Sequence, residues 1–299
     1  MIDYAAARAI AMIVQTGSFE GAARRLNVTP SAISQRVRNI EERLGTVLIQ
    51  RGQPCTATEA GAWLCRHMDH LGMLEQALFE HLPGLGDPDN PSRLMLEIAT
   101  NADSLGTWFM PALAAFAQDA GHLFNLSIDD EQHTADWLRQ GRVLAAVTSH
   151  GTPVQGCLSK PLGRLRYRAT ASPAFLHRHA PQGVTPQMLS RAPALVFNRK
   201  DNLQQNWVRQ VFGQCPELPC HFLPSTQGFV DACRAGLGWG LNPEKLVLDH
   251  LRSGALVELV PGASFDVPLF WQISRLAADR LQDLTRKVLA AAKSELEPD

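Results

Sequence analysis

Residues 27–39 read NVTPSAISQRVRN, a run in which capping residues open a short helix. Thr29 is a typical N-cap, and Pro30 follows at the first helical position, where its missing N–H costs no hydrogen bond. At about 100° per residue, one face of this helix is an apolar stripe and the opposite face is polar. The stripe is formed by Ile33, Val37 and Ile40, and the polar face by Ser31, Ser34, Gln35 and Arg38. The stripe is expected to be buried, and the polar face suits the floor of the DNA major groove, which admits one helix.

Two further helices are expected before this one. Asp3 can cap the first and Ser18 the second, and a tight turn at Asn27 and Val28 leads into the helix that Thr29 opens. Two short helices joined by a tight turn make a helix-turn-helix, whose second helix enters the major groove. A merely solvated helix face is the alternative, but the preceding capped helix and the tight turn favour DNA binding.

The charge of residues 1–58 supports the same interpretation. Seven arginines against four acidic residues give this segment a net charge of +3, whereas the whole chain carries −1. Such an asymmetry favours a nucleic-acid contact. After Gly45, VLIQR and CTAT predict the two strands of a wing, and Arg51 at its tip is expected to reach a phosphate or the minor groove. The predicted DNA-binding residues are Thr29, Ser31, Ser34, Gln35, Arg38 and Arg51.

Length and composition set the class of protein. A chain of 299 residues with 45% hydrophobic and 19% charged residues predicts two or three soluble globular units. Asp3 and Arg8 interrupt the apolar start, which does not have the pattern of a signal peptide, and no apolar run approaches the roughly 18 residues of a membrane span. A cytoplasmic location without membrane contact is therefore expected. Cys215 and Cys220 are either a disulfide or metal pair or, more in keeping with a cytosolic protein, reduced thiols.

A long helix is expected after the wing, starting at the cap Thr58. Leucines recur every seven residues along it, at positions 64, 71, 78 and 85, which predicts a dimerisation seam. A helix packed on its own domain is the alternative. The stretch PGLGDPDNPS at residues 83–92 reads as a linker.

The stretch GSFEGAARRLNVTPSAISQRVRNIEERLGTVLIQR, followed by TATEAG, resembles the winged helix-turn-helix of LysR-type transcriptional regulators. The resemblance implies an α+β multidomain protein with a winged helix-turn-helix, a linker helix and a two-lobed α/β effector domain of the periplasmic-binding-protein type. It implies ligand-tuned transcription by dimers that assemble into tetramers. The expected domains are residues 1–58 for DNA binding, 59–91 for the linker and 92–299 for the effector, with lobe I at about 92–161 and 266–299 and lobe II at about 162–265.

From about residue 93, strands and helices alternate in an order that predicts parallel α/β architecture. Ligands bind beyond the carboxyl ends of such strands. Three arginines and seven acids between residues 93 and 150 give a net charge of −4, and Asp103 and Asp129 lie at strand ends, which favours a cationic ligand. Ser104, at a helix start, favours a carboxylate. A basic amino acid carries both groups. The alternative is that these acids only cap a helix or are solvated.

The segments NADSLGTWFMPAL, PLGRLRYRATASPAF, FNRKDNLQQ and PSTQGFVDACRAGLGWGLNP resemble the ArgP/LysG subgroup of the same family. That resemblance implies a regulator that senses lysine or arginine and activates a basic amino acid exporter gene. It implies effector contacts from Asp103, Ser104, Asp129 and Thr148, with second-lobe groups from Asn198 to Asp201 and from Thr226 and Gln227. Asn242 is a departure, because a hydrophobic residue is expected before Pro243.

Motifs for catalysis do not stand out. The sequence contains no Walker loop and no GxSxG elbow, and the glycines of GLGWG follow a helix, which is the wrong context for a nucleotide. His133, near Asp129 and Asp130, is more simply a surface histidine than a metal ligand or a base. No catalytic residue, cofactor or metal is expected. The alternatives to a regulator are an architectural or replication-inhibiting DNA-binding protein and, less favoured, an enzyme with a DNA-binding appendage.

Overall fold

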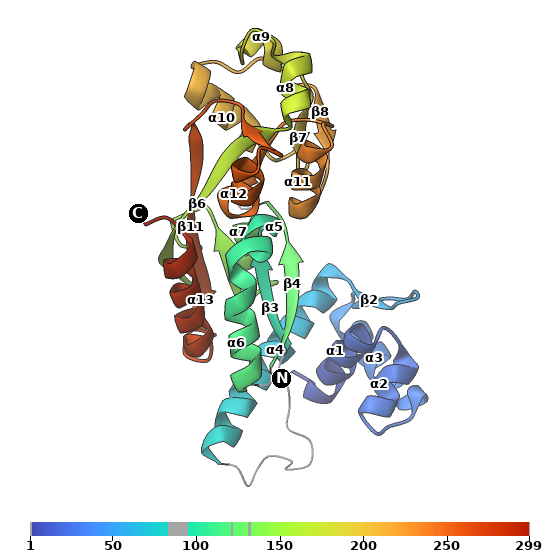
Figure 1. The fold of residues 1–299 in the computed structure, drawn as a ribbon. Helices are drawn as coiled ribbons and strands as arrows, with labels where there is room; N and C mark the ends of the chain where they lie inside the picture. The colour runs from blue at the N-terminus through green and yellow to red at the C-terminus, as the bar shows by residue number, and fades with distance from the viewer. Residues whose placement is uncertain (1, 83–94, 121, 131–132, 299) are drawn as a thin grey trace. The chain divides into compact units, whose positions relative to one another are not determined.

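The computed structural model describes residues 2–82, 95–120, 122–130 and 133–298. The chain forms two compact units, residues 1–94 and residues 95–299 (Figure 1). The first unit contains helices and a two-stranded wing, and the second is a mixed α/β domain. The fold class predicted from the sequence is therefore confirmed.

Side-chain caps start the first three helices, α1 (Tyr4–Thr16), α2 (Phe19–Arg25) and α3 (Pro30–Leu44). Asp3, Ser18 and Thr29 are the capping residues, as predicted, and each accepts a backbone N–H three residues ahead. Gly17 and Gly45 end α1 and α3 in the left-handed conformation, which glycine adopts without steric penalty. Local sequence thus sets both ends of α1 and of α3.

The predicted stripe of α3 is buried. Ile33, Val37 and Ile40 are at most 3% exposed and pack with apolar residues of α1 and α2 in one core cluster. Burying an aliphatic side chain contributes about 1.5–3 kcal/mol. This stripe fixes the rotation of α3, and the polar face is consequently turned outward.

The wing consists of strands β1 (Ile49–Gln50) and β2 (Thr56–Ala57), which pair antiparallel. The Glu41 carboxylate accepts the backbone N–H groups of Leu48 and Ile49 at 2.7 and 3.2 Å. Since Glu41 belongs to α3, this carboxylate joins the helix to the start of the wing.

Helix α4 (Glu59–His81) begins at the predicted cap Thr58. Its first turns pack on the core of the N-terminal unit through Leu64, whereas Leu74 and Leu78 are 67% and 48% exposed. The packing alternative thus holds for the first turns of α4, and the dimerisation seam stays a prediction for the exposed leucines. Leu85 lies outside the described residues.

The C-terminal unit is built on a seven-stranded sheet of order β10-β6-β11-β5-β3-β4, with β9 also paired to β6. Strand β3 runs parallel to β4 and β5, but β11 is antiparallel to β5 and β6. The predicted parallel arrangement is confirmed for β3, β4 and β5 but does not extend to β11, which returns from the far part of the chain against the direction of β5. The strands are β3 (Met95–Thr100), β4 (Leu123–Ile128), β5 (Ala145–Thr148), β6 (Cys157–Ala171), β9 (Gly240–Pro243), β10 (Val257–Glu258) and β11 (Ser264–Ser274).

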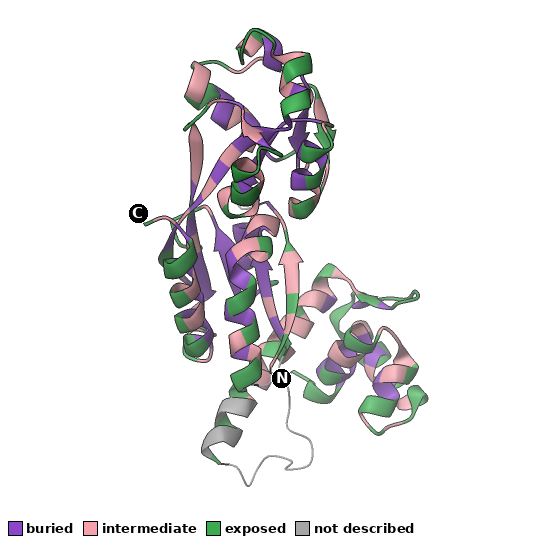
Figure 2. Cartoon of the chain, viewed as in Figure 1, coloured by how far each residue is buried: buried purple, intermediate pink, exposed green. Residues whose placement is uncertain are grey.

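Two groups of elements surround this sheet, and the long strands β6 and β11 run through both (Figure 1). In the first group, β3 and β5 are the most buried strands (Figure 2). Its helical segments are α5 (Ala102–Ser104), the π-helical turn η2 (Leu105–Phe109), α6 (Met110–Ala120), α7 (Thr134–Arg139) and α13 (Gln282–Glu295). The second group adds a parallel β7–β8 pair and comprises α8 (Pro173–His179), α9 (Pro186–Leu189), β7 (Ala194–Val196), α10 (Leu203–Phe212), β8 (Cys220–Phe222), α11 (Thr226–Arg234) and α12 (Glu244–Arg252).

Sequence and structure differ in some details. Helix α13 begins at Gln282, after residues that form turns. All six cysteines are free thiols, including Cys215 and Cys220. Among the described residues, no helix is long and apolar enough to cross a membrane. The boundaries of the two lobes stay a prediction.

Candidate functional site

The outer face of α3 carries the predicted DNA-binding side chains. Ser31, Gln35 and Arg38 are exposed, and Ser34 is half-buried. The Gln35 amide donates to Oδ1 of Asn39 at 2.7 Å, one helical turn away. This contact orients Gln35, and the spacing of four residues in the sequence is the signal that identifies it.

The remaining two predicted DNA-binding residues already have intramolecular contacts. The Thr29 hydroxyl caps α3 and lies 3.0 Å from the Ser31 hydroxyl. The Arg51 guanidinium lies 5.4 Å from the centre of the Phe19 ring, at the start of the wing turn. An exposed cation–π contact contributes only about 0.5–1 kcal/mol, so it does not hold Arg51 away from a phosphate.

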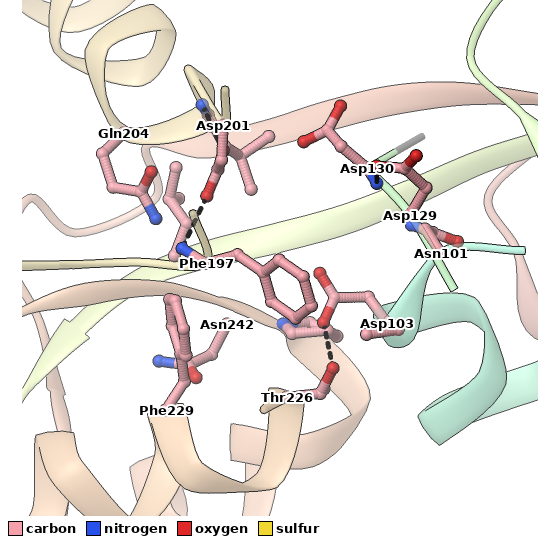
Figure 3. Close-up of a pocket in the computed structure, with 14 residues that line it drawn as sticks. Asn101, Asp103, Asp129, Asp130, Phe197, Asp201, Gln204, Thr226, Phe229 and Asn242 are labelled. Atoms are coloured by element: carbon pink, nitrogen blue, oxygen red, sulfur yellow. Dashed lines mark hydrogen bonds between the residues drawn. The ribbon is translucent and has the colours of Figure 1, made fainter. Parts of the chain in front are cut away.

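A pocket opens in the C-terminal unit between the two groups of elements (Figure 3). The pocket has a volume of about 470 Å³, which includes space open to solvent. Its lining residues are Asn101, Ala102, Asp103, Asp129, Asp130, Phe197, Asp201, Leu203, Gln204, Thr226, Phe229, Leu241, Asn242 and Pro243.

Asp103 links the two sides of this pocket. It accepts a hydrogen bond from the Thr226 hydroxyl at 2.6 Å and another from the Tyr167 hydroxyl at 2.8 Å. Burial raises the pKa of Asp103, while these two hydrogen bonds act in the opposite direction. The first contact joins α5 to α11, elements that are more than 100 residues apart in sequence.

Asp129 and Asp130 follow strand β4. Asp129 accepts the indole N–H of Trp137 at 3.1 Å, and Asp130, which is 7% exposed, lies 3.5 Å from Nδ1 of His133. Within the described ranges, no group of three or more potential ligands is arranged to hold a metal ion. His133 thus lies beside one carboxylate, that of Asp130.

Asp201 is the fourth carboxylate of the pocket and is 7% exposed. It accepts the backbone N–H groups of Phe197 and Leu203 at 3.0 and 2.8 Å. Burial raises the pKa of Asp201 to about 6, and the charges of Asp130 and Asp103 act in the same direction. The carboxylates thus repel one another, and the lining residues that the structure describes include no lysine, arginine or histidine to offset them.

Two neutral side chains in the lining have polar atoms without partners among the described residues. Gln204 is fully buried, and neither atom of its amide has a hydrogen-bond partner. Asn242, also fully buried, donates to the Thr170 hydroxyl at 2.9 Å, but its Oδ1 has no partner. Atoms of this kind that lie beside a pocket can form hydrogen bonds with a polar ligand or with water.

The structure brings together some of the predicted effector-binding residues. Asp103, Asp129, Asp201 and Thr226 line the pocket, whereas Ser104, Thr148 and Asn198 do not.

The other three positions lie outside the lining. Ser104 and Thr148 are fully buried; the Ser104 hydroxyl has no partner among the described residues, and the Thr148 hydroxyl accepts the backbone N–H of His150. Asn198 accepts the N–H groups of Lys200 and Asp201, which shapes the loop that carries Asp201. Direct roles of these three residues in effector binding stay predictions.

Gln204, Phe197, Phe229 and Asn242 were not among the predicted site residues. Gln204 precedes the fully buried Trp207 and Val208 by three and four residues, so helical spacing alone places it on the inner face of α10. Asn242 stood out in the sequence only as a departure from the family pattern, and this departure adds an amide to the pocket.

Comparison with known proteins agrees with this architecture. A family model described as "Bacterial regulatory helix-turn-helix protein, lysR family" matches residues 5–62, and the "LysR substrate binding domain" matches residues 90–297. The HTH-type transcriptional regulator LysG of Mycobacterium tuberculosis is 43% identical over 284 residues, which cover 95% of this chain and 91% of that protein.

Two solved structures are similar over the whole chain. The crystal structure of ArgP from Mycobacterium tuberculosis is 40% identical, with a TM-score of 0.80 and full coverage of both chains. The full-length LysG from Corynebacterium glutamicum with bound effector Arg is 36% identical, with a TM-score of 0.69 and coverage of 99% of this chain and 100% of that one.

These relatives are transcriptional regulators rather than enzymes, and their names confirm the resemblance to the ArgP/LysG subgroup. The two family models match the two structural units in order along the chain. This protein therefore belongs to the LysR family of bacterial transcriptional regulators.

Proposed function

We propose that this LysR-family regulator senses a basic amino acid, lysine or arginine, in the pocket around Asp103, and that it binds double-stranded DNA through α3. Its proposed role is to control, by activation, a gene for an exporter of basic amino acids. The relative from Corynebacterium glutamicum with bound effector Arg supports the choice of ligand class.

One observation carries the proposal: four carboxylates, from Asp103, Asp129, Asp130 and Asp201, line one pocket, and none of the described residues in its lining is cationic. A buried cluster of like charges is unfavourable unless it is protonated or a cation neutralises it. A basic amino acid supplies two cationic groups. Each charge-assisted hydrogen bond contributes about 1.5–3 kcal/mol, which offsets the loss of water from the ligand.

For the ligand to change the activity of the regulator, the protein must have two states with different affinities for the ligand. The contacts of Asp103 with Thr226 and Tyr167 hold both sides of the pocket together without ligand. A cation that binds Asp103 competes with or adds to these bonds. Ligand binding thereby changes the relative stability of the open and closed domain.

In this proposal, two copies of the chain form a dimer through α4. Its exposed leucines, Leu74 and Leu78, together with the 60% exposed Trp63, form an apolar surface that a second copy would cover. A homodimer presents two recognition helices to half-sites one helical turn apart, and two dimers form a tetramer. Contact with chromosomal DNA implies a cytoplasmic location.

A thermal-shift screen of the twenty amino acids with the full chain tests the proposal. Lysine and arginine should raise the melting temperature, by roughly 5–10 °C at a hundredfold excess over Kd, and the other amino acids should not. A response to none of the twenty favours the architectural DNA-binding alternative. A response to acidic or apolar amino acids instead contradicts the assignment of the pocket.

A further inference from the structure

The end of the pocket formed by α10 and β9 differs from the rest in its chemistry. Gln204 is fully buried, and both its Oε1 and its Nε2 lack partners among the described residues. An unsatisfied buried polar atom costs about 1–3 kcal/mol. A folded protein keeps two such atoms on one side chain at little cost only when a polar occupant pairs with them.

Asn242 adds a further acceptor. Its amide N–H donates to the Thr170 hydroxyl on β6, which holds the side chain in place, and its Oδ1 is left without a partner. Asn242 is fully buried, yet it lines the pocket. Its carbonyl oxygen and that of Gln204 therefore remain for a ligand that donates hydrogen bonds.

A carboxylate and two aromatic rings complete this end of the pocket. Asp201 lies three residues before Gln204 and is held by backbone N–H groups. Phe197 and Phe229 line the same pocket, and the Phe197 ring lies between the Gln204 side and the Asp129 side (Figure 3). We call the set of Asp201, Gln204, Asn242, Phe197 and Phe229 the amide subsite.

The chemistry of the amide subsite distinguishes the two basic amino acids. A guanidinium is planar, carries five N–H donors, is weakly hydrated and stacks on aromatic rings. It can donate hydrogen bonds to Asp201 and to both amide oxygens at once while it stacks on an aromatic ring. An ammonium is a compact, strongly hydrated charge with three donors, and it leaves separated acceptors unpaired.

Building on the function proposed above, we propose that the amide subsite binds the guanidinium group, so that arginine is the preferred effector and lysine the weaker one. The two N–H donors of the Gln204 Nε2 then remain, and water beside the ligand can accept from them. Without this subsite, the carboxylates alone would bind both amino acids about equally.

Calorimetric titration of the full chain with L-arginine and L-lysine tests the inference. The parent protein should bind arginine at least tenfold more tightly than lysine. Gln204→Met and Asn242→Leu each replace an amide by an apolar group of similar size. Each substitution should weaken the binding of arginine about ten- to a hundredfold and the binding of lysine less than threefold. Gln205→Met, on the same helix but outside the pocket lining, is the control and should change neither affinity.

The outcomes separate this inference from the proposed function. If the parent binds lysine as tightly as arginine or more tightly, the amide subsite does not bind the guanidinium, although sensing of basic amino acids stands. Equal losses for both ligands in the two variants contradict the inference as well. If the parent binds neither ligand, the proposed function itself fails. The ratio of affinities in the parent decides the matter even where a variant does not fold.

Discussion

The Thr226 hydroxyl lies 2.6 Å from Oδ1 of Asp103, and this hydrogen bond joins the start of α11 to α5 across the pocket. The Tyr167 hydroxyl binds the other oxygen of the same carboxylate. Asp103 is thus both a ligand candidate and a connection between the two groups of elements. A change at this position is expected to affect ligand affinity more than folding.

Asp103→Asn removes one charge and keeps the shape of the side chain. Thr and Tyr hydroxyls accept as well as donate, so both contacts survive and the melting temperature of the free protein should hardly change. Arginine affinity should fall about ten- to a hundredfold, which calorimetry measures. Thr226→Val, which removes only the hydroxyl, is the comparison. Unchanged arginine affinity in Asp103→Asn places the cation elsewhere.

The α3 face gives a prediction about DNA sequence. Gln35→Ala should cost about 1–3 kcal/mol at the cognate site and leave binding to random DNA nearly intact, because Gln35 reads a base edge. Fluorescence anisotropy with both DNAs measures the two affinities. Equal losses on both DNAs would mean that Gln35 touches only the backbone.

Arg51 should behave differently. Arg51→Ala is expected to weaken cognate and random DNA alike and to reduce the slope of affinity against salt concentration by about one unit, because a phosphate contact carries no sequence information. The measurement is a salt titration of both complexes. An unaltered slope shows that Arg51 stays on Phe19 and does not contact a phosphate.

The exposed part of α4 gives a prediction about assembly. Leu74→Asp combined with Leu78→Asp places two charges in the proposed dimer contact, where an unpaired buried charge is strongly unfavourable. Sedimentation velocity should show dissociation toward monomers. Leu276→Asp, at a leucine that is 77% exposed in the C-terminal unit, is the control. If the double variant keeps the assembly of the parent, α4 is not the contact.

Asp201 gives a prediction about pH. Burial raises its pKa in the folded protein from 3.8 to about 6, so its contribution to stability is complete below about pH 4 and is lost as the pH rises through about 6. The difference corresponds to about 3 kcal/mol. In Asp201→Asn, the change in the free energy of unfolding between pH 4 and pH 7 should differ from that of the parent by about this amount. Identical pH profiles in denaturant titrations would contradict a raised pKa.

The sequence predicted the N-terminal unit almost completely, because its signals are local. The caps Asp3, Ser18 and Thr29 and the stripe of Ile33, Val37 and Ile40 depend on neighbours within a few residues along the chain. Strand β11 is different. Its antiparallel pairing with β5 joins residues more than 100 positions apart, and no local pattern specifies the direction of a returning strand.

The pocket was only partly predictable for the same reason. Charge at strand ends indicated Asp103 and Asp129, but the pairing of Asp103 with Thr226 joins residues 123 positions apart. Composition does not predict which polar side chains are buried. Gln204 and Asn242 were not predicted as site residues, and it is the fold that places both, fully buried, against the pocket.

Titration with L-arginine at pH 8 tests directly whether this pocket binds a basic amino acid. The full chain is compared with a variant that carries both Asp103→Asn and Asp201→Asn. The parent should bind one arginine per chain. The double variant should bind at least a hundredfold more weakly, because two charge-assisted contacts are lost. Equal affinity in the two proteins, or no saturable binding to the parent, would mean that arginine does not bind in this pocket.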